Sequence, residues 1–194
     1  MLTVKNKKLL CLGDSLTYGY GVRRSECWVA LASEKPGWEL INCGICGDTG
    51  CGMLARFSLL AAEHRPYAVF VMGGTNDIIC SGSDCVARSC VSAIIQQAQA
   101  MGIKPLLGIP PRMLHGKISD SWTGLADFDK VSEISEEYSL WLRHFADFFG
   151  VPTVDFSELY YKESKDELSL DGIHPNKEGH RLMAELITKE LGAI

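Results

Sequence analysis

Five short apolar runs, each followed by a segment of helical periodicity, constrain the fold of this chain more than any other feature. The runs have the length and composition of strands that are buried on both faces of a sheet. Strands that alternate with helices over short links predict a parallel sheet with helices on both faces. The predicted strands are residues 9–12, 40–42, 68–72, 106–109 and 153–155, and the predicted helices run from the N-cap Ser25 to the residue before Pro36 and over residues 50–63, 84–100, 131–149 and 176–191.

Length and charge narrow the class of protein further. The chain has 194 residues and neither an internal repeat nor a linker, so one domain over residues 1–194 is expected. A net charge of −5 gives no electrostatic reason to expect nucleic acid or an anionic membrane surface as a partner. No apolar run approaches the length of a membrane span, and residues 1–10 lack the apolar stretch of an export signal. We therefore expect a cytoplasmic protein, and nothing in the sequence predicts its oligomeric state.

The chain contains eight cysteines, whose spacing indicates whether they can bind a metal ion. Without an export signal the cellular compartment is reducing, so free thiols that serve as small apolar residues are expected. Two groups, Cys43, Cys46 and Cys51 and then Cys80, Cys85 and Cys90, could instead be metal or cluster ligands. Neither spacing matches a common site, and no nearby histidine completes one. We therefore predict no metal and no cofactor.

The polar and glycine-rich motifs fall in the segments that follow the predicted strands. In open sheets of this class, ligands bind at the carboxyl ends of the strands. The longest irregular segment, residues 110–130, follows the fourth strand, and a segment of that length suggests a function. The segments concerned are residues 13–21, 43–52, 73–84, 110–130 and 156–175.

Two of these motifs contain small residues that leave room for a reacting group. Ser15, in Gly-Asp-Ser-Leu at 13–16, can present its hydroxyl to a cleft, although Thr17 departs from the Gly-x-Ser-x-Gly pattern and a turn serine is the simpler reading. The glycines of residues 44–50 allow backbone N–H groups to approach an anion. A dinucleotide or phosphate loop is the alternative here, but neither of its glycine signatures is present.

The other two motifs supply an amide and an imidazole. Asn76, in Gly-Thr-Asn-Asp at 74–77, can donate to a developing oxyanion or can simply form an Asx turn. His174 follows Asp171 by three residues and precedes a proline, which suits an imidazole held by a carboxylate. Of the other histidines, His115 lies on the long segment and can face the cleft. His64, His144 and His180 lie in predicted helices and are expected at the surface or at the edge of the core.

Taken together and in this order, the four motifs resemble those of the GDSL/SGNH hydrolase family over the whole chain. The resemblance implies a flavodoxin-like three-layer α/β/α sandwich with five parallel strands in the order 2-1-3-4-5. It also implies that Ser15 is the nucleophile, His174 the base and Asp171 its orienting partner. The implied oxyanion hole consists of the backbone N–H groups of Ser15 and Gly47 and the side-chain amide of Asn76.

The resulting functional prediction is a metal-independent serine esterase that acts on a small-molecule ester through an acyl-enzyme. The alternatives are a fatty-acyl thioesterase or lysophospholipase, an acyltransferase with the same triad, and a binding module that has lost catalysis. Apolar and charged residues are mixed over 110–130, which favours a short acyl group, such as acetyl. Asp14, His115 and Trp122 are candidate substrate contacts. Asp14 and Asp77, beside the motif residues, are interpreted as fixing their loops rather than as acids in the reaction.

Overall fold

Five parallel strands form one sheet in the order β2-β1-β3-β4-β5, as expected from the sequence. The structure, a computed structural model, describes residues 6–114, 116–122, 124–160 and 168–192. The strands are β1 (Lys7–Gly13), β2 (Trp38–Gly44), β3 (Ala68–Met72), β4 (Lys104–Ile109) and β5 (Thr153–Asp155). Each predicted strand is present, and the first, second and fourth extend beyond the apolar runs that predicted them.

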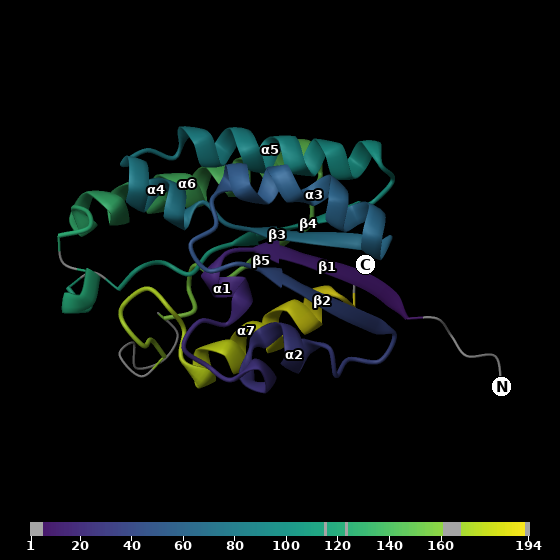
Figure 1. Ribbon diagram of the computed structural model, residues 1–194, viewed down its shortest axis with the longest axis horizontal. Coiled ribbons are helices and arrows are strands. Elements are labelled where there is room, and N and C mark those ends of the chain that lie inside the picture. The colour runs from purple at the N-terminus through teal and green to yellow at the C-terminus, as the bar shows by residue number, and fades with distance from the viewer. Residues whose placement is uncertain (1–5, 115, 123, 161–167, 193–194) are drawn as a thin grey trace.

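Helices cover both faces of the sheet (Figure 1). They bury two apolar clusters, one on each face. One face carries α3 (Gly50–His64), α5 (Cys85–Ala100) and α6 (Phe128–Phe149), and the other carries α2 (Trp28–Ala32) and α7 (Lys177–Glu190). Alternate residues of β3 point to opposite clusters, Val71 to the first and Phe70 and Met72 to the second. Because β3 is buried on both faces, its sequence is a continuous apolar run and not an alternating one.

The helices differ from the sequence prediction in four places. Ser25 does not cap a helix but lies inside a 3-10 turn, η1 (Arg24–Glu26), and α2 begins only at Trp28. Two short helices, α1 (Ser15–Tyr18) and α4 (Thr75–Ser81), replace predicted loops, and residues 110–130 contain a second 3-10 turn, η2 (Asp120–Trp122). Within the described ranges, no helix is both long enough and apolar enough to cross a membrane.

The pairing of the strands brings three of the four motifs to one edge of the sheet. Gly13, the last residue of β1, pairs with Gly44 of β2 and with Met72 of β3, so the segments after these strands leave the sheet side by side. Position 13 has no room for a side chain, because a Cβ there would lie 2.2 Å from the Thr17 hydroxyl and 2.6 Å from the Met72 carbonyl. This close approach allows α1 to fold back directly over the end of β1.

Candidate active site

Ser15 is the first residue of α1 and lies directly beyond the end of β1. The side chain of Asp14 caps this helix, since its Oδ1 accepts the N–H of Leu16 at 2.9 Å, and Gly19 ends it in the left-handed conformation. The Ser15 Oγ lies 3.0 Å from His174 Nε2, although 159 residues separate the two in sequence. The structure therefore brings together the serine and the imidazole that the sequence singled out.

Asp171 holds His174 in the orientation that faces Ser15. Its Oδ2 lies 2.8 Å from His174 Nδ1, and its Oδ1 accepts the backbone N–H groups of Ile173 and His174. A proton on Nδ1, facing the carboxylate, leaves Nε2 to accept the serine hydroxyl proton. Partial burial alone would raise the pKa of Asp171, but the hydrogen bonds from His174 hold that pKa well below its usual range. Asp171 is therefore ionised at neutral pH.

Two aromatic side chains flank the imidazole. The Nε1–H of Trp122 donates to Asp171 Oδ2 at 3.0 Å, the same oxygen that faces His174, and the Trp122 ring centroid lies 5.8 Å from that of His174. The Tyr20 ring, which is 46% exposed, lies 4.5 Å from the His174 ring. Tyr20 was not a predicted site residue. Its position follows from the turn after α1, and no spacing in the sequence reveals it.

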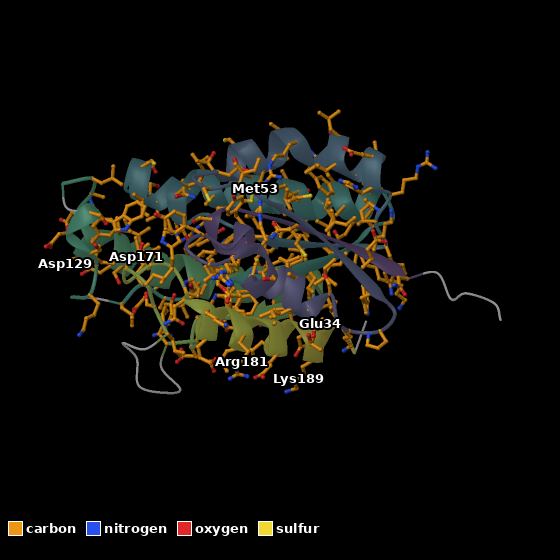
Figure 2. All side chains as sticks on the ribbon, turned by 60° about the horizontal axis from the view of Figure 1, so that its bottom comes forward. Glu34, Met53, Asp129, Asp171, Arg181 and Lys189 are labelled. Carbon is orange, nitrogen blue, oxygen red and sulfur yellow. The ribbon has the colours of Figure 1, made fainter. Side chains whose placement is uncertain are left out.

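The segment after β4 is tied to the loop that carries the acid and the base. Leu114 donates its N–H to the carbonyl of Gly172, and Ser119 donates its N–H to the carbonyl of Asp171. Trp122 and Phe128 pack against the first apolar cluster, so this segment is anchored to the core as well. Figure 2 shows Asp171 toward the same end of the molecule as Asp129, near the start of α6. His115, the other candidate contact on this segment, lies outside the described residues.

The three predicted oxyanion donors lie on the segments that follow β1, β2 and β3. Gly47 is exposed and has a φ of 79°, and neither its N–H nor that of Ser15 has an acceptor within the described part of the chain. The Asn76 amide donates one hydrogen to the Asp48 carbonyl at 2.8 Å. One hydrogen of this amide remains, so all three groups retain an N–H for a ligand.

An ion pair fixes the loop that contains Gly47. The Arg56 Nε donates to Asp48 Oδ2 at 2.8 Å, and its Nη2 donates to the Gly13 carbonyl at 3.0 Å. Arg56 therefore links α3, the loop and the end of β1. Sequence reasoning missed this link, because Asp48 lies outside the helix and eight residues separate the two.

Asp77 has the loop-fixing position that the sequence suggested. It is buried, and its Oδ2 accepts the N–H of Gly50, the first residue of α3, at 2.9 Å. Burial raises the pKa of the Asp77 carboxyl above its usual value, and the bond from Gly50 opposes that shift. This contact joins the segment after β3 to the start of α3.

For Asp14 the structure requires a correction. Its side chain has no exposed surface, so Asp14 does not line a substrate cleft, and the predicted substrate contact is wrong. It lies beneath the site as the cap of α1, and within the described residues its Oδ2 has no hydrogen-bond partner. Burial, opposed by the bond from Leu16, raises the pKa of Asp14 from 3.8 to about 6.

A serine hydroxyl bound to an imidazole that is in turn held by a carboxylate, beside free backbone N–H groups, is the arrangement shared by serine hydrolases. Comparison with known proteins agrees with this class. Residues 11–182 match the GDSL-like Lipase/Acylhydrolase family. The chain therefore belongs to that family, and it is a hydrolase of the SGNH type that acts on ester bonds.

Individual relatives cover nearly the whole chain. The thioesterase 1/protease 1/lysophospholipase L1 of Escherichia coli K12 is 30% identical over 189 residues, which cover 94% of this chain and 82% of the relative. An arylesterase of Vibrio mimicus is 29% identical over 196 residues, or 96% of this chain and 88% of the relative. A solved structure from the lipolytic protein G-D-S-L family of Veillonella parvula shares the fold, with a TM-score of 0.80, 21% identity and coverage of 97% of this chain and all of that one.

Proposed function

We propose that this protein hydrolyses a small carboxylic ester through an acyl-enzyme formed on Ser15, with His174 as the base. The observation that carries this proposal is the chain of contacts from Ser15 Oγ to His174 Nε2 at 3.0 Å and from His174 Nδ1 to Asp171 Oδ2 at 2.8 Å. A serine hydroxyl is a weak nucleophile near neutral pH and needs an adjacent base.

In the acylation step, Ser15 Oγ attacks the ester carbonyl carbon while His174 Nε2 takes the hydroxyl proton. The ionised Asp171 stabilises the imidazolium that forms. The N–H groups of Ser15 and Gly47 and the free amide hydrogen of Asn76 bind the oxyanion, each with a contribution of about 2.7–4 kcal/mol to transition-state stability. His174 then gives its proton to the leaving alkoxide, and water, deprotonated by the same imidazole, releases the acid.

The residues near the carboxyl ends of the strands favour a substrate with a short acyl group. A long chain needs an extended apolar groove, since each buried methylene contributes about 0.8 kcal/mol. The segment after β4, which meets the loop that carries Asp171 and His174, mixes apolar residues such as Met113 and Leu125 with charged residues such as Arg112 and Asp127. This mixture supports a small, partly polar substrate.

A second candidate function is hydrolysis of fatty-acyl thioesters or lysophospholipids. It is favoured by the Escherichia coli relative, whose name includes thioesterase and lysophospholipase. The two candidates differ in chain-length dependence. Values of kcat/KM for p-nitrophenyl esters from acetate to decanoate should peak at the short end, and a rise that continues past hexanoate would favour the second candidate. An acyl-CoA substrate with a panel of alcohol acceptors tests the acyltransferase alternative.

Labelling with a fluorophosphonate tests the nucleophile directly. The probe should add once per chain, at Ser15, as judged by peptide mass mapping, and the Ser15→Ala variant should not be labelled. The His174→Ala variant should lose several orders of magnitude in kcat, because the triad acts as a unit. The His115→Ala variant is the matched histidine control and should lose much less. Labelling that persists in Ser15→Ala, or a larger loss in His115→Ala, would overturn the assignment.

A further inference from the structure

Two of the eight cysteines lie close together, on helices that carry neither Ser15 nor His174. All eight are free thiols, and the Sγ atoms of Cys51 and Cys90 are 3.4 Å apart. Cys51 is the second residue of α3 and is exposed, whereas Cys90, in α5, is only 6% exposed. One thiol of the pair is therefore open to a reagent in solution, and the other lies directly behind it.

Small residues explain why α3 and α5 approach each other so closely near Cys51 and Cys90. A Cβ on Gly50 would lie 2.9 Å from the Cβ of Cys90 and 3.5 Å from the Cα of Ala87, so the start of α3 rests almost directly on α5. A disulfide has an S–S length of about 2.05 Å, so the two sulfur atoms need to approach by only about 1.4 Å.

We propose that Cys51 and Cys90 are a redox modification site, at which a low-molecular-weight disulfide converts the two thiols into a reversible disulfide. The Cys51 thiolate attacks the small disulfide and releases one thiolate, which leaves a mixed disulfide on Cys51. The Cys90 thiol loses its proton and attacks the Cys51 sulfur, and the second small thiolate leaves. Overall, two protein thiols are oxidised and one small disulfide is reduced to two thiols, so protons and electrons balance.

The environment of each sulfur atom sets this order. Burial and the neighbouring Cys51 thiol raise the pKa of Cys90 to about 11, so Cys90 is a poor first nucleophile near neutral pH. Once Cys51 carries the mixed disulfide, its sulfur atom becomes the electrophile nearest to Cys90. Cys51 therefore reacts first with the small disulfide, because it is exposed. Cys90 then completes the bond, because it lies next to Cys51.

The cross-link would join α3 and α5, which precede and follow α4, the helix that carries Asn76, along the chain. Cys51 directly follows Gly50, whose N–H binds the Asp77 carboxylate next to Asn76. A disulfide between residues 51 and 90 closes a loop that contains β3 and α4 and lowers the entropy of the unfolded chain. The oxidised protein should therefore melt at a higher temperature than the reduced protein. This expectation goes beyond ester hydrolysis and does not depend on the substrate.

The test uses the folded, fully reduced protein incubated with glutathione disulfide near neutral pH, followed by acid quenching, denaturation and alkylation. Cys51 and Cys90 should no longer be alkylated and neither should carry glutathione, so the number of alkylated thiols should fall from eight to six or fewer, and the joined peptides should have lost two hydrogen masses. Peptide mapping should find Cys51 joined to Cys90. The melting temperature should rise by about 5–10 °C, and a dithiol reductant should reverse the rise.

Three variants make the outcome specific. The Cys51→Ser variant, at an exposed position, should retain the Cys90 thiol and show no rise in melting temperature on oxidation. The Cys90→Ser variant should retain a glutathione adduct on Cys51. The Cys46→Ser variant removes another exposed thiol and should still form the cross-link. Eight remaining thiols in the wild type, a cross-link that lacks either residue, or a cross-linked protein that melts no higher would each overturn the proposal.

Discussion

Replacing Trp122 by phenylalanine should slow catalysis by about tenfold while leaving the fold intact. The indole Nε1–H donates to Asp171 Oδ2 at 3.0 Å, and that oxygen also faces His174 Nδ1 at 2.8 Å. Phenylalanine retains an aromatic ring against the core and beside the imidazole but has no donor. The substitution therefore separates the hydrogen bond from the packing of the ring.

The magnitude follows from what still holds Asp171 in the variant. A hydrogen bond to a charged group contributes about 1.5–3 kcal/mol. The backbone N–H groups of Ile173 and His174 still bind Asp171 Oδ1, so the carboxylate stays in place and loses only one constraint on Oδ2. We therefore expect a loss near the lower limit, about 1.4 kcal/mol, which corresponds to about tenfold in kcat/KM. The loss should fall on kcat rather than KM, because the imidazolium that Asp171 stabilises forms only in the reaction.

Steady-state kinetics with p-nitrophenyl acetate measure this effect. Trp122→Ala, which removes both the donor and the ring, should lose more activity than Trp122→Phe. Trp141→Phe is the matched control, because Trp141 stacks on Tyr138 and Phe145 in α6 and should leave kcat close to wild type. Wild-type kinetics in Trp122→Phe together with a large loss in Trp122→Ala would refute the reasoning, since the ring alone would then be responsible.

Three further predictions concern single residues at the same edge of the sheet. Asn76→Ala removes a proposed oxyanion donor, so kcat for p-nitrophenyl acetate should fall about 100- to 1,000-fold, and an unchanged kcat would contradict the assignment. Gly74→Ala puts a Cβ 2.6 Å from the Tyr138 ring at a φ of 107°, so urea unfolding should reveal a loss of about 1–3 kcal/mol, and wild-type stability would contradict this packing. Burial raises the pKa of Asp14 from 3.8 to about 6, so across that interval the native state binds a proton that the unfolded state releases, and its stability falls as pH rises. Relative to Asp14→Asn, the wild type should lose about 3 kcal/mol of unfolding free energy from pH 3 to pH 7, and a pH-independent difference would count against the burial of this charge.

The parts of the fold that depend on local pattern could be predicted from the sequence. Buried strands show as apolar runs, and long amphipathic helices show as apolar residues at helical spacing, as in α5. The contact between Asp171 and His174 is also local, since three residues separate them. The approach of Ser15 to His174 spans the whole chain, and its prediction required the resemblance to a known family as well as the rule that ligands bind at strand ends.

What could not be predicted depends on contacts between distant segments. The short helices α1 and α4 form where the chain turns over a strand end, and neither is long enough to show a period. The bond from Trp122 to Asp171 exists only because the segment after β4 meets the loop before α7. His180 was expected at the surface or the edge of the core, yet it is 1% exposed. There its Nδ1 accepts the backbone N–H of Trp28, and burial lowers the pKa of His180 to about 4.

Two buried carboxylates fix the backbone around the proposed catalytic residues, although burial makes a negative charge unfavourable at both positions. Asp14 and Asp77 each accept one backbone N–H that fixes the start of a helix, and burial raises the pKa of both. Neutral side chains there would cost less free energy of folding, but an amide in place of Asp14 would weaken the cap that positions Ser15, because a charged acceptor binds an N–H more strongly. The two apolar clusters on either side of the sheet offset this cost. A variant such as Asp14→Asn should therefore gain stability at neutral pH and lose turnover, the trade-off expected where a site is held by strained or desolvated groups.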